Sequence, residues 1–413
     1  MTAAGVERPY DLVLYGASGF VGRLVAAELA HRRPGPDARI ALAGRSRERL
    51  AAVRRGLGPA ASGWALLVAD AGDHSALDAL AASSRAVIST VGPYWRYGLP
   101  LVQACAGAGT HYADLTGEVL FHRASIDTCQ VAAASSGARI VHSCGFDSIP
   151  SDLGVLLLAQ AAAADDAGGL GATTLTVLSA RGGISGGTID SLRAQQDAVR
   201  ADRGVVDVLR DPYALSPARE EEPDLEGRDV YAVRRQPERG GWVGPFVMAP
   251  YNTRVVRRSN ALSGWSYGRR FRYREVVRYG RGPRGCARAL ATTGGLGLVA
   301  AGLRMPASRT ALDRLLPAPG SGPDEKARRN GRFRMQIETE TDGGVRYLCT
   351  VAAAGDPGYA ATSLMLAEGG LCLAFDRPRL PARAGVLTPA TAMGTVLVER
   401  LRAAGMTFDV RRS

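Results

Sequence analysis

Lysine is almost absent from this chain. Lys326 is the only lysine among 413 residues, and every other basic residue is arginine, in a Lys and Arg total of 51. Short-chain dehydrogenases need Tyr-x-x-x-Lys, in which the ammonium group lowers the pKa of the tyrosine that acts as the acid. Gly322 stands four positions before Lys326, so this catalytic pair is excluded. A phosphate-loop lysine and a Schiff-base lysine are excluded as well, because no matching sequence surrounds Lys326.

Cysteine and histidine are also scarce. The six cysteines include no C-x-x-C pair, and the five histidines have no second ligand at helical spacing. The sequence therefore predicts no metal site and no disulfide framework, which favours a reducing, cytoplasmic compartment. No segment near the N-terminus has the basic and apolar regions of a secretory signal.

No apolar run reaches the length that spans a bilayer. The longest candidate, 287–303, contains Arg288 and is interrupted by glycines and threonines. It predicts a buried helix. The alternative is peripheral contact with the inner face of the plasma membrane.

The formal charge of +12 comes from arginine and has two interpretations. Arginines concentrate between 254 and 278, and in Arg270-Phe-Arg-Tyr-Arg-Glu their alternation puts them on one face of an expected strand. They form either a solvated outer face or a patch that attracts an anionic partner, such as an acyl carrier protein, a phosphorylated thioester or a lipid headgroup. No segment resembles a nucleic-acid-binding module. We expect no nucleic-acid partner.

The most informative pattern lies near the N-terminus. An apolar strand from Asp11 to Tyr15 runs into Gly16-x-x-Gly19-x-x-Gly22, which a helical pattern follows. Glycines at such a turn let the backbone approach a pyrophosphate, whose charge meets free N–H groups at the helix start. The alternative is a tight turn without a ligand. The residues expected at the pyrophosphate are Gly16, Ala17, Ser18, Gly19, Phe20, Val21 and Gly22.

The end of the second strand indicates which dinucleotide binds. An NAD site usually has Asp or Glu there, about 20 residues after the glycines, to hold the ribose 2′-hydroxyl. This chain has Arg45 and Ser46 instead, which suits a 2′-phosphate. Arg47 alone is equally explained as part of a solvated first helical turn. The sequence therefore predicts NADP(H) as the cofactor.

Strand and helix patterns alternate over the first 145 residues, which predicts a doubly wound parallel sheet. Ligands bind such sheets at the carboxyl ends of the strands. Asp70 follows the third strand, and we expect it near the adenine. The turn after the fourth strand is expected beside the nicotinamide and contains Thr90, Val91, Gly92 and Pro93.

Two further blocks, 111–118 and 142–154, combine small and polar residues where strands run into helices. Helix capping by Asp147, Ser148 and Ser151, with Pro150 in the first turn, explains part of this pattern. Their expected position beside the nicotinamide indicates a role in the site. The sequence leaves both interpretations open.

Together these motifs resemble one family. Gly16-Ala-Ser-Gly-Phe-Val-Gly, Ala43-Gly-Arg-Ser, Thr90-Val-Gly-Pro-Tyr, Tyr112-Ala-Asp-Leu-Thr-Gly-Glu and Cys144-Gly-Phe-Asp-Ser-Ile-Pro-Ser-Asp resemble the saccharopine-dehydrogenase-like oxidoreductases. Within that group the chain looks most like the actinobacterial trans-acting enoyl reductases, over nearly its whole length. The resemblance implies a partner, a polyketide synthase or acyl carrier protein that bears an unsaturated acyl chain. It also implies a role in complex cell-envelope lipid, and hence glycolipid, biosynthesis.

The expected domains are an NADP-binding domain over 1–150, an α+β substrate domain over 151–385 and a C-terminal segment over 386–413. The second domain is expected to contain a mixed or antiparallel sheet, with a hairpin at Arg332 to Val351 around the turn Asp342-Gly-Gly. The resemblance implies that the last helix returns to the first domain. The Gly-rich stretch 181–187 predicts either a hinge or a cleft lining.

The resulting hypothesis is hydride transfer from NADPH to the β-carbon of an enoyl thioester, with water or a side chain protonating the α-carbon. Tyr94 is the first candidate for an acid or oxyanion donor, followed by Asp147 and Tyr112. Two alternatives stay open. One is a redox sensor that binds NADP(H) without catalysis, and the other is a reductase of C=N bonds of the saccharopine type.

Overall fold

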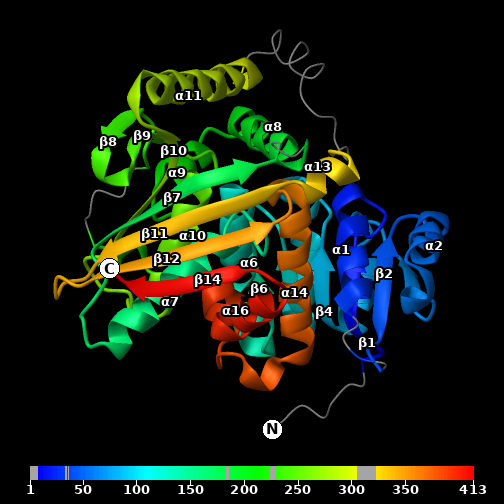
Figure 1. Cartoon of the computed structure of the whole chain (residues 1–413). Coiled ribbons are helices and arrows are strands. Elements are labelled where there is room, and N and C mark those ends of the chain that lie inside the picture. Colours follow the sequence, from blue (N-terminus) through cyan, green and yellow to red (C-terminus); the bar gives the residue numbers. More distant parts are fainter. Residues whose placement is uncertain (1–7, 33–34, 36, 183–185, 224–228, 305–321) are drawn as a thin grey trace. The chain divides into compact units, whose positions relative to one another are not determined.

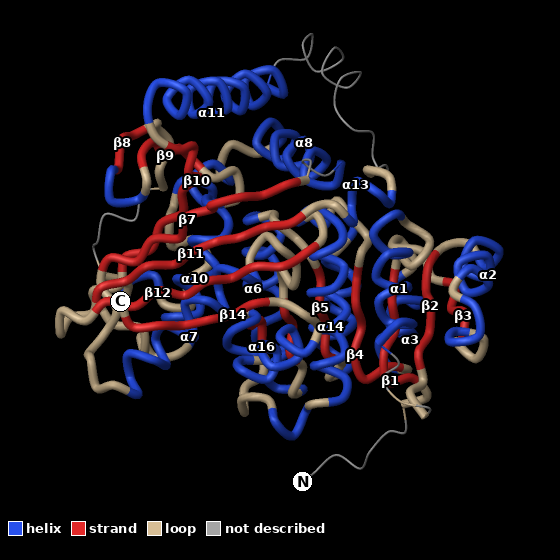
Figure 2. Tube along the Cα trace, viewed as in Figure 1, coloured by secondary structure: helices blue, strands red, loops and turns tan. Residues whose placement is uncertain are grey.

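The chain forms two compact units, each built on a seven-stranded sheet (Figures 1 and 2). Unit 1 comprises Met1–Thr116, Phe121–Gly145 and Thr362–Arg400, and unit 2 comprises Gly117–Leu120, Phe146–Ala361 and Leu401–Ser413. The computed structural model describes residues 8–32, 35, 37–182, 186–223, 229–304 and 322–413. Positions 183–185 of the Gly-rich stretch lie outside the described residues, so its role as hinge or cleft lining stays open.

The sheet of unit 1 is entirely parallel and has the order β13-β6-β5-β4-β1-β2-β3. This is the doubly wound arrangement, with one additional strand beside β6. The central strands are apolar and buried on both faces, as parallel sheets require. The strands are β1 Tyr10–Tyr15, β2 Ile40–Gly44, β3 Ala65–Val68, β4 Ser84–Ser89, β5 His111–Asp114, β6 Arg139–Val141 and β13 Gly385–Leu387.

Some helices of unit 1 begin at a side chain that accepts one of the first free N–H groups. Ser46 accepts a hydrogen bond from Arg49 N at the start of α2, and Asp73 accepts one from Ala76 N at the start of α3. α14 packs on α1, β1, β4 and β5 (Figure 1). The helices are α1 Phe20–Arg32, α2 Arg47–Gly56, α3 His74–Ala82, α4 Tyr94–Tyr97, α5 Leu99–Ala108, α6 Val119–Ser136, α14 Thr362–Phe375, α15 Pro389–Ala392 and α16 Gly394–Ala403.

The sheet of unit 2 is mixed and has the order β14-β12-β11-β7-β10-β9-β8. Only β7 and β10 pair in parallel; the other neighbours are antiparallel. The expected hairpin is confirmed, since β11 and β12 pair from Arg332↔Ala354 to Glu340↔Arg346. The strands are β7 Ala172–Arg181, β8 Arg234–Gln236, β9 Gly241–Pro245, β10 Arg272–Gly280, β11 Arg332–Glu340, β12 Arg346–Ala354 and β14 Thr407–Arg412.

Two buried helices, α7 and α10, pack against the sheet of unit 2, α7 on β11 and β12 and α10 on β10. The helices of this unit are α7 Ile149–Ala164, α8 Gly186–Ala201, α9 Val205–Arg210, α10 Ala249–Leu262, α11 Gly282–Arg304 and α13 Glu325–Arg329. Single turns of 3₁₀ or π helix in the two units occupy Gly58–Ala61, Arg219–Glu221, Pro237–Arg239, Pro357–Ala361 and Arg377–Arg379.

The α/β fold class is confirmed, but two C-terminal details differ from the expectation. The segment 386–413 contains more than a helix, because β14 pairs with β12 in the sheet of unit 2. The segment 362–400, expected mostly in the second domain, belongs to unit 1 and supplies α14. Both differences come from pairings between residues far apart in the chain, which no local pattern reports.

Arg254, Arg257 and Arg258 correct the expectation of a solvated face or an anion-attracting patch. All three are buried in α10. Their guanidinium groups donate to backbone carbonyls of the preceding segment, among them Leu209 O and Leu215 O. Burial lowers the pKa of Arg254 and of Arg257. These arginines hold a loop in place and are unavailable to a partner.

One helical segment in the described part of the chain, Pro357–Phe375, is long and apolar enough to cross a membrane, with a mean hydropathy of 1.2. It is 78% buried over that length, and its α14 part lies in the core of unit 1. A core helix of this composition passes the same test, so the finding is weak evidence for a membrane span.

Candidate functional site

The glycine turn in unit 1 has the geometry of a pyrophosphate cradle. Gly16 directly follows β1 and has φ +86°, a backbone conformation that L side chains rarely adopt. A Cβ on Gly22 would lie 2.1 Å from Gly16 O, so only glycine lets α1 begin this close to β1. The first turn of α1 leaves N–H groups without intrahelical partners, which suits a diphosphate. The residues present therefore fit the expected cofactor.

Thr90 fixes this turn from the neighbouring strand. Its N–H donates to Tyr15 O at 3.0 Å, and its Oγ1 lies 3.2 Å from both Tyr15 O and Gly16 O. A Cβ on Gly16 would approach Thr90 Oγ1 to 2.7 Å and Val91 Cγ2 to 2.8 Å. Thr90 and Val91 were expected to approach the cofactor. They also shape the turn itself.

Arg45 and Asp70 meet at the carboxyl edge of the sheet of unit 1, as their positions after β2 and β3 require. Arg45 Nε lies 4.0 Å from Asp70 Oδ2, and both side chains are exposed. Such an exposed pair contributes little to stability, so Arg45 is free to turn toward an anion. Ser46 caps α2 with its hydroxyl, which also puts the N-terminus of α2 at this edge.

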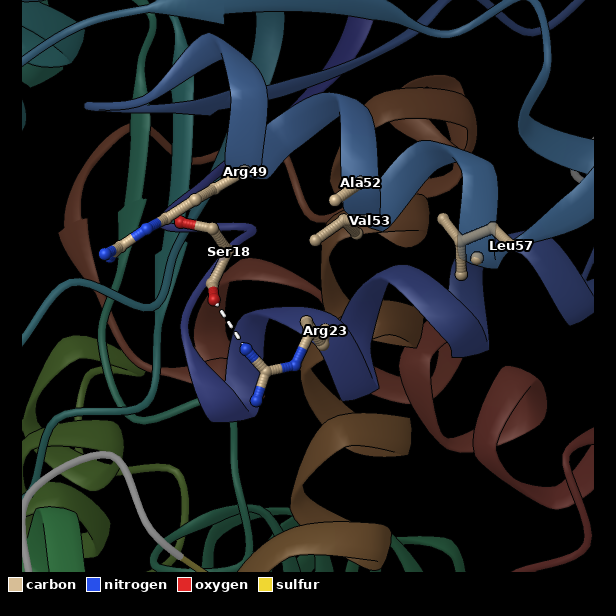
Figure 3. Close-up of a pocket in the computed structure, with 7 residues that line it drawn as sticks. Ser18, Arg23, Arg49, Ala52, Val53 and Leu57 are labelled. Atoms are coloured by element: carbon tan, nitrogen blue, oxygen red, sulfur yellow. Dashed lines mark hydrogen bonds between the residues drawn. The ribbon is translucent and has the colours of Figure 1, made fainter.

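A cavity of about 520 Å³ lies between α1 and α2, next to the glycine turn (Figure 3). Ser18, Arg23 and Arg49 lie at one end of it, and apolar residues of α2 line the rest. Arg23 Nη1 donates to Ser18 O at 2.8 Å. Sequence reasoning missed Arg23 and Arg49. For Arg49 the sequence did contain a signal: it stands three residues after the N-cap Ser46, which places it on the first turn of α2, next to the edge that bears Arg45.

We expect Arg45→Ala to raise the Kd for NADPH by roughly 10- to 100-fold and to leave the Kd for NADH almost unchanged. Only NADPH has the 2′-phosphate, and a charge-assisted hydrogen bond contributes about 1.5–3 kcal/mol. Fluorescence titration with both nucleotides measures the ratio. Arg47→Ala, which removes an exposed arginine two residues further along the chain, at the first position of α2, is the matched control. Equal losses for NADPH and NADH would contradict the assignment of Arg45 to the 2′-phosphate.

Tyr94 begins α4 in unit 1 and is buried. Its hydroxyl donates to Ser89 O at 3.0 Å and accepts from Leu115 N at 3.4 Å, while its ring stacks on Phe121. The hydroxyl therefore connects the ends of β4 and β5. Its catalytic role remains a prediction. The turn before it contains Gly92 and Pro93, joined by a cis peptide bond.

Tyr112 is fully buried in β5. Burial, and next the charge of Asp114, raise the pKa of its hydroxyl well above the ordinary value. A tyrosine in these surroundings keeps its proton at neutral pH, which makes it a poor acid.

A cluster next to Tyr112 resembles the triad of serine hydrolases. His142 Nδ1 lies 2.8 Å from Asp114 Oδ2, and His142 Nε2 lies 2.8 Å from Ser125 Oγ. All three side chains are completely buried. Asp114 Oδ1 also accepts from the backbone N–H groups of Thr116 and Ser143, so the cluster ties the ends of β5 and β6 to α6. With no access for a substrate, its role is to hold the two strand ends.

Asp147 lies in unit 2, directly before the N-cap of α7. Part of the residue is exposed, but its carboxyl group is removed from solvent, and this burial raises the pKa of the carboxyl to about 7. Gly117 lies next to this carboxyl: a Cβ built on Gly117 would lie 3.7 Å from Asp147 Oδ2, and the same Cβ would lie 3.0 Å from Met248 Cε. A carboxylic acid with such a pKa can hold a proton at neutral pH and release it.

A buried hydrogen-bond network fixes the chain beside Asp147. Ser148 Oγ donates to Asn252 Oδ1, and Asn252 Nδ2 donates to Glu275 Oε2 at 2.9 Å. Ser151 and Tyr273 both donate to Glu275 Oε1. Burial raises the pKa of Glu275 to about 7, although the hydrogen bonds that its carboxylate accepts act to lower that pKa. The network joins the start of α7 to α10 and β10. The expectation that Ser148 and Ser151 cap the helix is wrong: Ser148 stands at the N-cap position without a side-chain capping bond, Ser151 lies within α7, and both hydroxyls donate into this network.

Among the residues that the structure describes, no group of three or more His, Cys, Asp or Glu could hold a metal ion. All six cysteines are free, and five of them are buried. Among the described residues, unit 1 contains the nucleotide turn, the Arg45 edge, Tyr94 and Tyr112, and unit 2 contains Asp147.

Comparisons with known proteins agree with this geometry. The sequence model of the saccharopine dehydrogenase NADP-binding domain matches residues 12–141, which confirms the cofactor prediction. A Mycobacterium tuberculosis protein named as a candidate trans-acting enoyl reductase is 51% identical, over 100% of this chain and 99% of its own. A Mycobacterium ulcerans protein named trans-acting enoyl reductase is 46% identical, over 99% of each chain.

The fold also has a solved counterpart. Saccharopine dehydrogenase (L-Glu forming) from Saccharomyces cerevisiae aligns with a TM-score of 0.53 over 97% of this chain and 99% of its own, at 13% identity. This likeness concerns the fold alone. With the cofactor turn and the full-length relatives, it leads to one conclusion: the chain is an NADP-dependent oxidoreductase that belongs to the saccharopine-dehydrogenase-like family, in the group of the mycobacterial trans-acting enoyl reductases.

Proposed function

We propose that this protein reduces the C=C bond of an enoyl thioester with NADPH, on an acyl chain that a partner synthase carries. The acyl chain belongs to a polyketide or fatty-acyl product of complex cell-envelope lipid, and hence glycolipid, biosynthesis. The observation that carries the proposal is the full-length identity of 46–51% to proteins named trans-acting enoyl reductases. The partner is a polyketide synthase or an acyl carrier protein, because a trans-acting reductase works on a chain that another protein holds.

The chemistry divides between cofactor and protein. Bound NADPH supplies a hydride to the β-carbon, and the α-carbon then needs one proton to complete the CH–CH bond. The glycine turn binds the pyrophosphate of the cofactor. Arg45 binds the 2′-phosphate on the ribose of the adenosine half. Asp147 is the proposed proton donor, because its raised pKa keeps it protonated near neutral pH. The network through Ser148, Asn252 and Glu275 orients the segment that bears Asp147.

Asp147 is preferred here to the two tyrosines for a physical reason. The hydroxyl of Tyr94 already donates to one backbone group and accepts from another. The hydroxyl of Tyr112 is fully buried, and its pKa is raised well above the ordinary value. Either tyrosine would have to lose contacts or gain solvent before donating a proton. The pKa of Asp147, raised to about 7, instead lets its carboxyl hold and release a proton near neutral pH.

The test is NADPH oxidation, followed at its absorbance band, with three substrates. They are a trans-2-enoyl thioester of N-acetylcysteamine, the matching saturated thioester, and 2-oxoglutarate with an amino acid as a source of C=N bonds. We expect turnover with the enoyl thioester alone and one saturated thioester formed per NADPH consumed. Turnover with the C=N substrate only would identify a saccharopine-type reductase. NADPH binding without turnover on thioesters, free or bound to an acyl carrier protein, would favour a redox sensor.

A further inference from the structure

Helix α11 in unit 2 has no charged residue between Arg288 and Arg304, although only one of its sides is packed. It contacts α8, β9 and β10 (Figure 1). Gly285 and Ala289 are buried on that side, and Thr293, Leu296 and Val299 are half-buried. A helix that is hydrophobic all round is normally buried all round. Over its described length α11 is packed on one side only, so the expectation of a buried helix over 287–303 is wrong.

The outward side of α11 exposes apolar residues to solvent. Leu298 is 76% exposed and Leu290 is 57% exposed. Ala287, Ala291 and Ala301 are exposed on the same side, together with glycines at 294, 295 and 297. Single exposed leucines are ordinary, but a continuous apolar helix face marks an interaction site. This side of α11 is therefore a candidate interaction surface.

The charges around the helix select the kind of partner. No acidic residue occurs between Glu275 and Asp313. Three exposed arginines, Arg281, Arg284 and Arg288, occupy the approach to α11 and its first two turns. A partner that is complementary to the apolar side and to the neighbouring arginines has an apolar region bordered by negative charge. An anionic lipid bilayer has this arrangement at its surface.

We propose that α11 lies in the surface of an anionic lipid bilayer, with Leu290 and Leu298 at the acyl boundary and the neighbouring arginines on lipid phosphates. The rest of the exposed side is formed by alanine and glycine, which offer no shaped anchor. Protein interfaces often centre on aromatic anchors that fill pockets, and α11 contains no aromatic residue. A bilayer requires no shape complementarity, so it fits this smooth surface better than a protein groove does. The proposal does not depend on the reaction proposed above.

The test is co-flotation of the full chain with vesicles. One set of vesicles contains phosphatidylcholine alone, and the other contains phosphatidylcholine mixed with phosphatidylglycerol. We expect binding to the mixed vesicles that weakens as salt is added, and little binding to the neutral ones. The double variant Leu290→Asp and Leu298→Asp should bind the mixed vesicles at least about 100-fold more weakly. Arg284→Gln with Arg288→Gln should weaken binding roughly 30-fold, because each arginine near an anionic surface contributes about fivefold.

Val131 supplies a matched control. It is 82% exposed on α6 in unit 1, so Val131→Asp removes an equally exposed apolar side chain elsewhere. This variant should bind vesicles like the unsubstituted protein. NADPH titration and circular dichroism establish that each variant is folded.

Three results would overturn the proposal. The first is a folded protein that does not bind the mixed vesicles, or whose two leucines make no difference. The second is a dimer in lipid-free solution that the double leucine variant dissociates, because a second copy of the chain would then cover α11. The third is leucine-dependent binding of an isolated acyl carrier protein without lipid.

Discussion

Gly22→Ala should lower the affinity for NADPH by roughly 100-fold, equivalent to about 3 kcal/mol. The added Cβ would lie 2.1 Å from Gly16 O and 2.9 Å from the Cα of Ala17. Both are backbone atoms, so the start of α1 must move away from the turn after β1. That movement separates the N–H groups that a pyrophosphate needs. Fluorescence titration with NADPH measures the loss.

Gly107→Ala is the control for this substitution. Gly107 lies in α5 of the same unit, and a Cβ there would meet nothing within 4 Å. The control should bind NADPH normally. Thermal unfolding of Gly22→Ala separates a damaged turn from a damaged fold, because a folded variant without affinity isolates the effect at the site. Unchanged affinity in a folded Gly22→Ala variant would refute the assignment of this turn to the pyrophosphate.

Asp147→Asn should lower turnover of an enoyl thioester by about 100- to 10,000-fold, the range that general acids contribute, while NADPH affinity stays the same. The amide of asparagine fills the same space but has no acidic proton. The pH profile gives a second readout. Burial raises the pKa of Asp147 to about 7, so the acid is protonated below that pH. We expect kcat/KM to be flat below about pH 7 and to fall about tenfold per unit above it.

Two comparisons make this prediction specific. Asp207→Asn changes an exposed carboxyl of the same unit and should leave turnover unchanged. Tyr94→Phe should lower stability by about 1 kcal/mol through the lost bond to Ser89 O, with only a small effect on turnover. If Tyr94→Phe abolishes turnover and Asp147→Asn leaves it unchanged, the proton donor is Tyr94. A decline in kcat/KM above pH 7 that persists in Asp147→Asn would assign the titration to another group.

The first half of the chain could be predicted because its signals are local. The turn from Gly16 to Gly22 combines a strand, a glycine spacing and a helix within about two dozen residues, and Arg45 follows at the end of the next strand. Each signal depends on neighbours in the sequence. Such patterns predict elements and cofactor well.

Other features depend on contacts between distant residues and could not be predicted. The sequence suggested that Arg254 is solvated, yet it is buried and donates hydrogen bonds to backbone carbonyls of residues about 40 positions earlier in the chain. The Asp114–His142–Ser125 cluster joins three separate elements. Glu275 receives hydrogen bonds from Ser151, more than a hundred residues earlier. No spacing of residues in the sequence predicts these contacts between distant segments.

The sequence by itself determined three things: the dinucleotide turn, the preference for NADP(H), and the exclusion of lysine-dependent catalysis by the isolated Lys326. Each rests on residue types at short spacing, where chain geometry leaves little choice. Tertiary structure decided which polar side chains are available for chemistry and which instead make the hydrogen bonds that hold strands and loops in place. Burial and pairing made that selection. They set the pKa of Asp147 near neutrality and enclosed Tyr112, and both effects arise only when distant segments pack together.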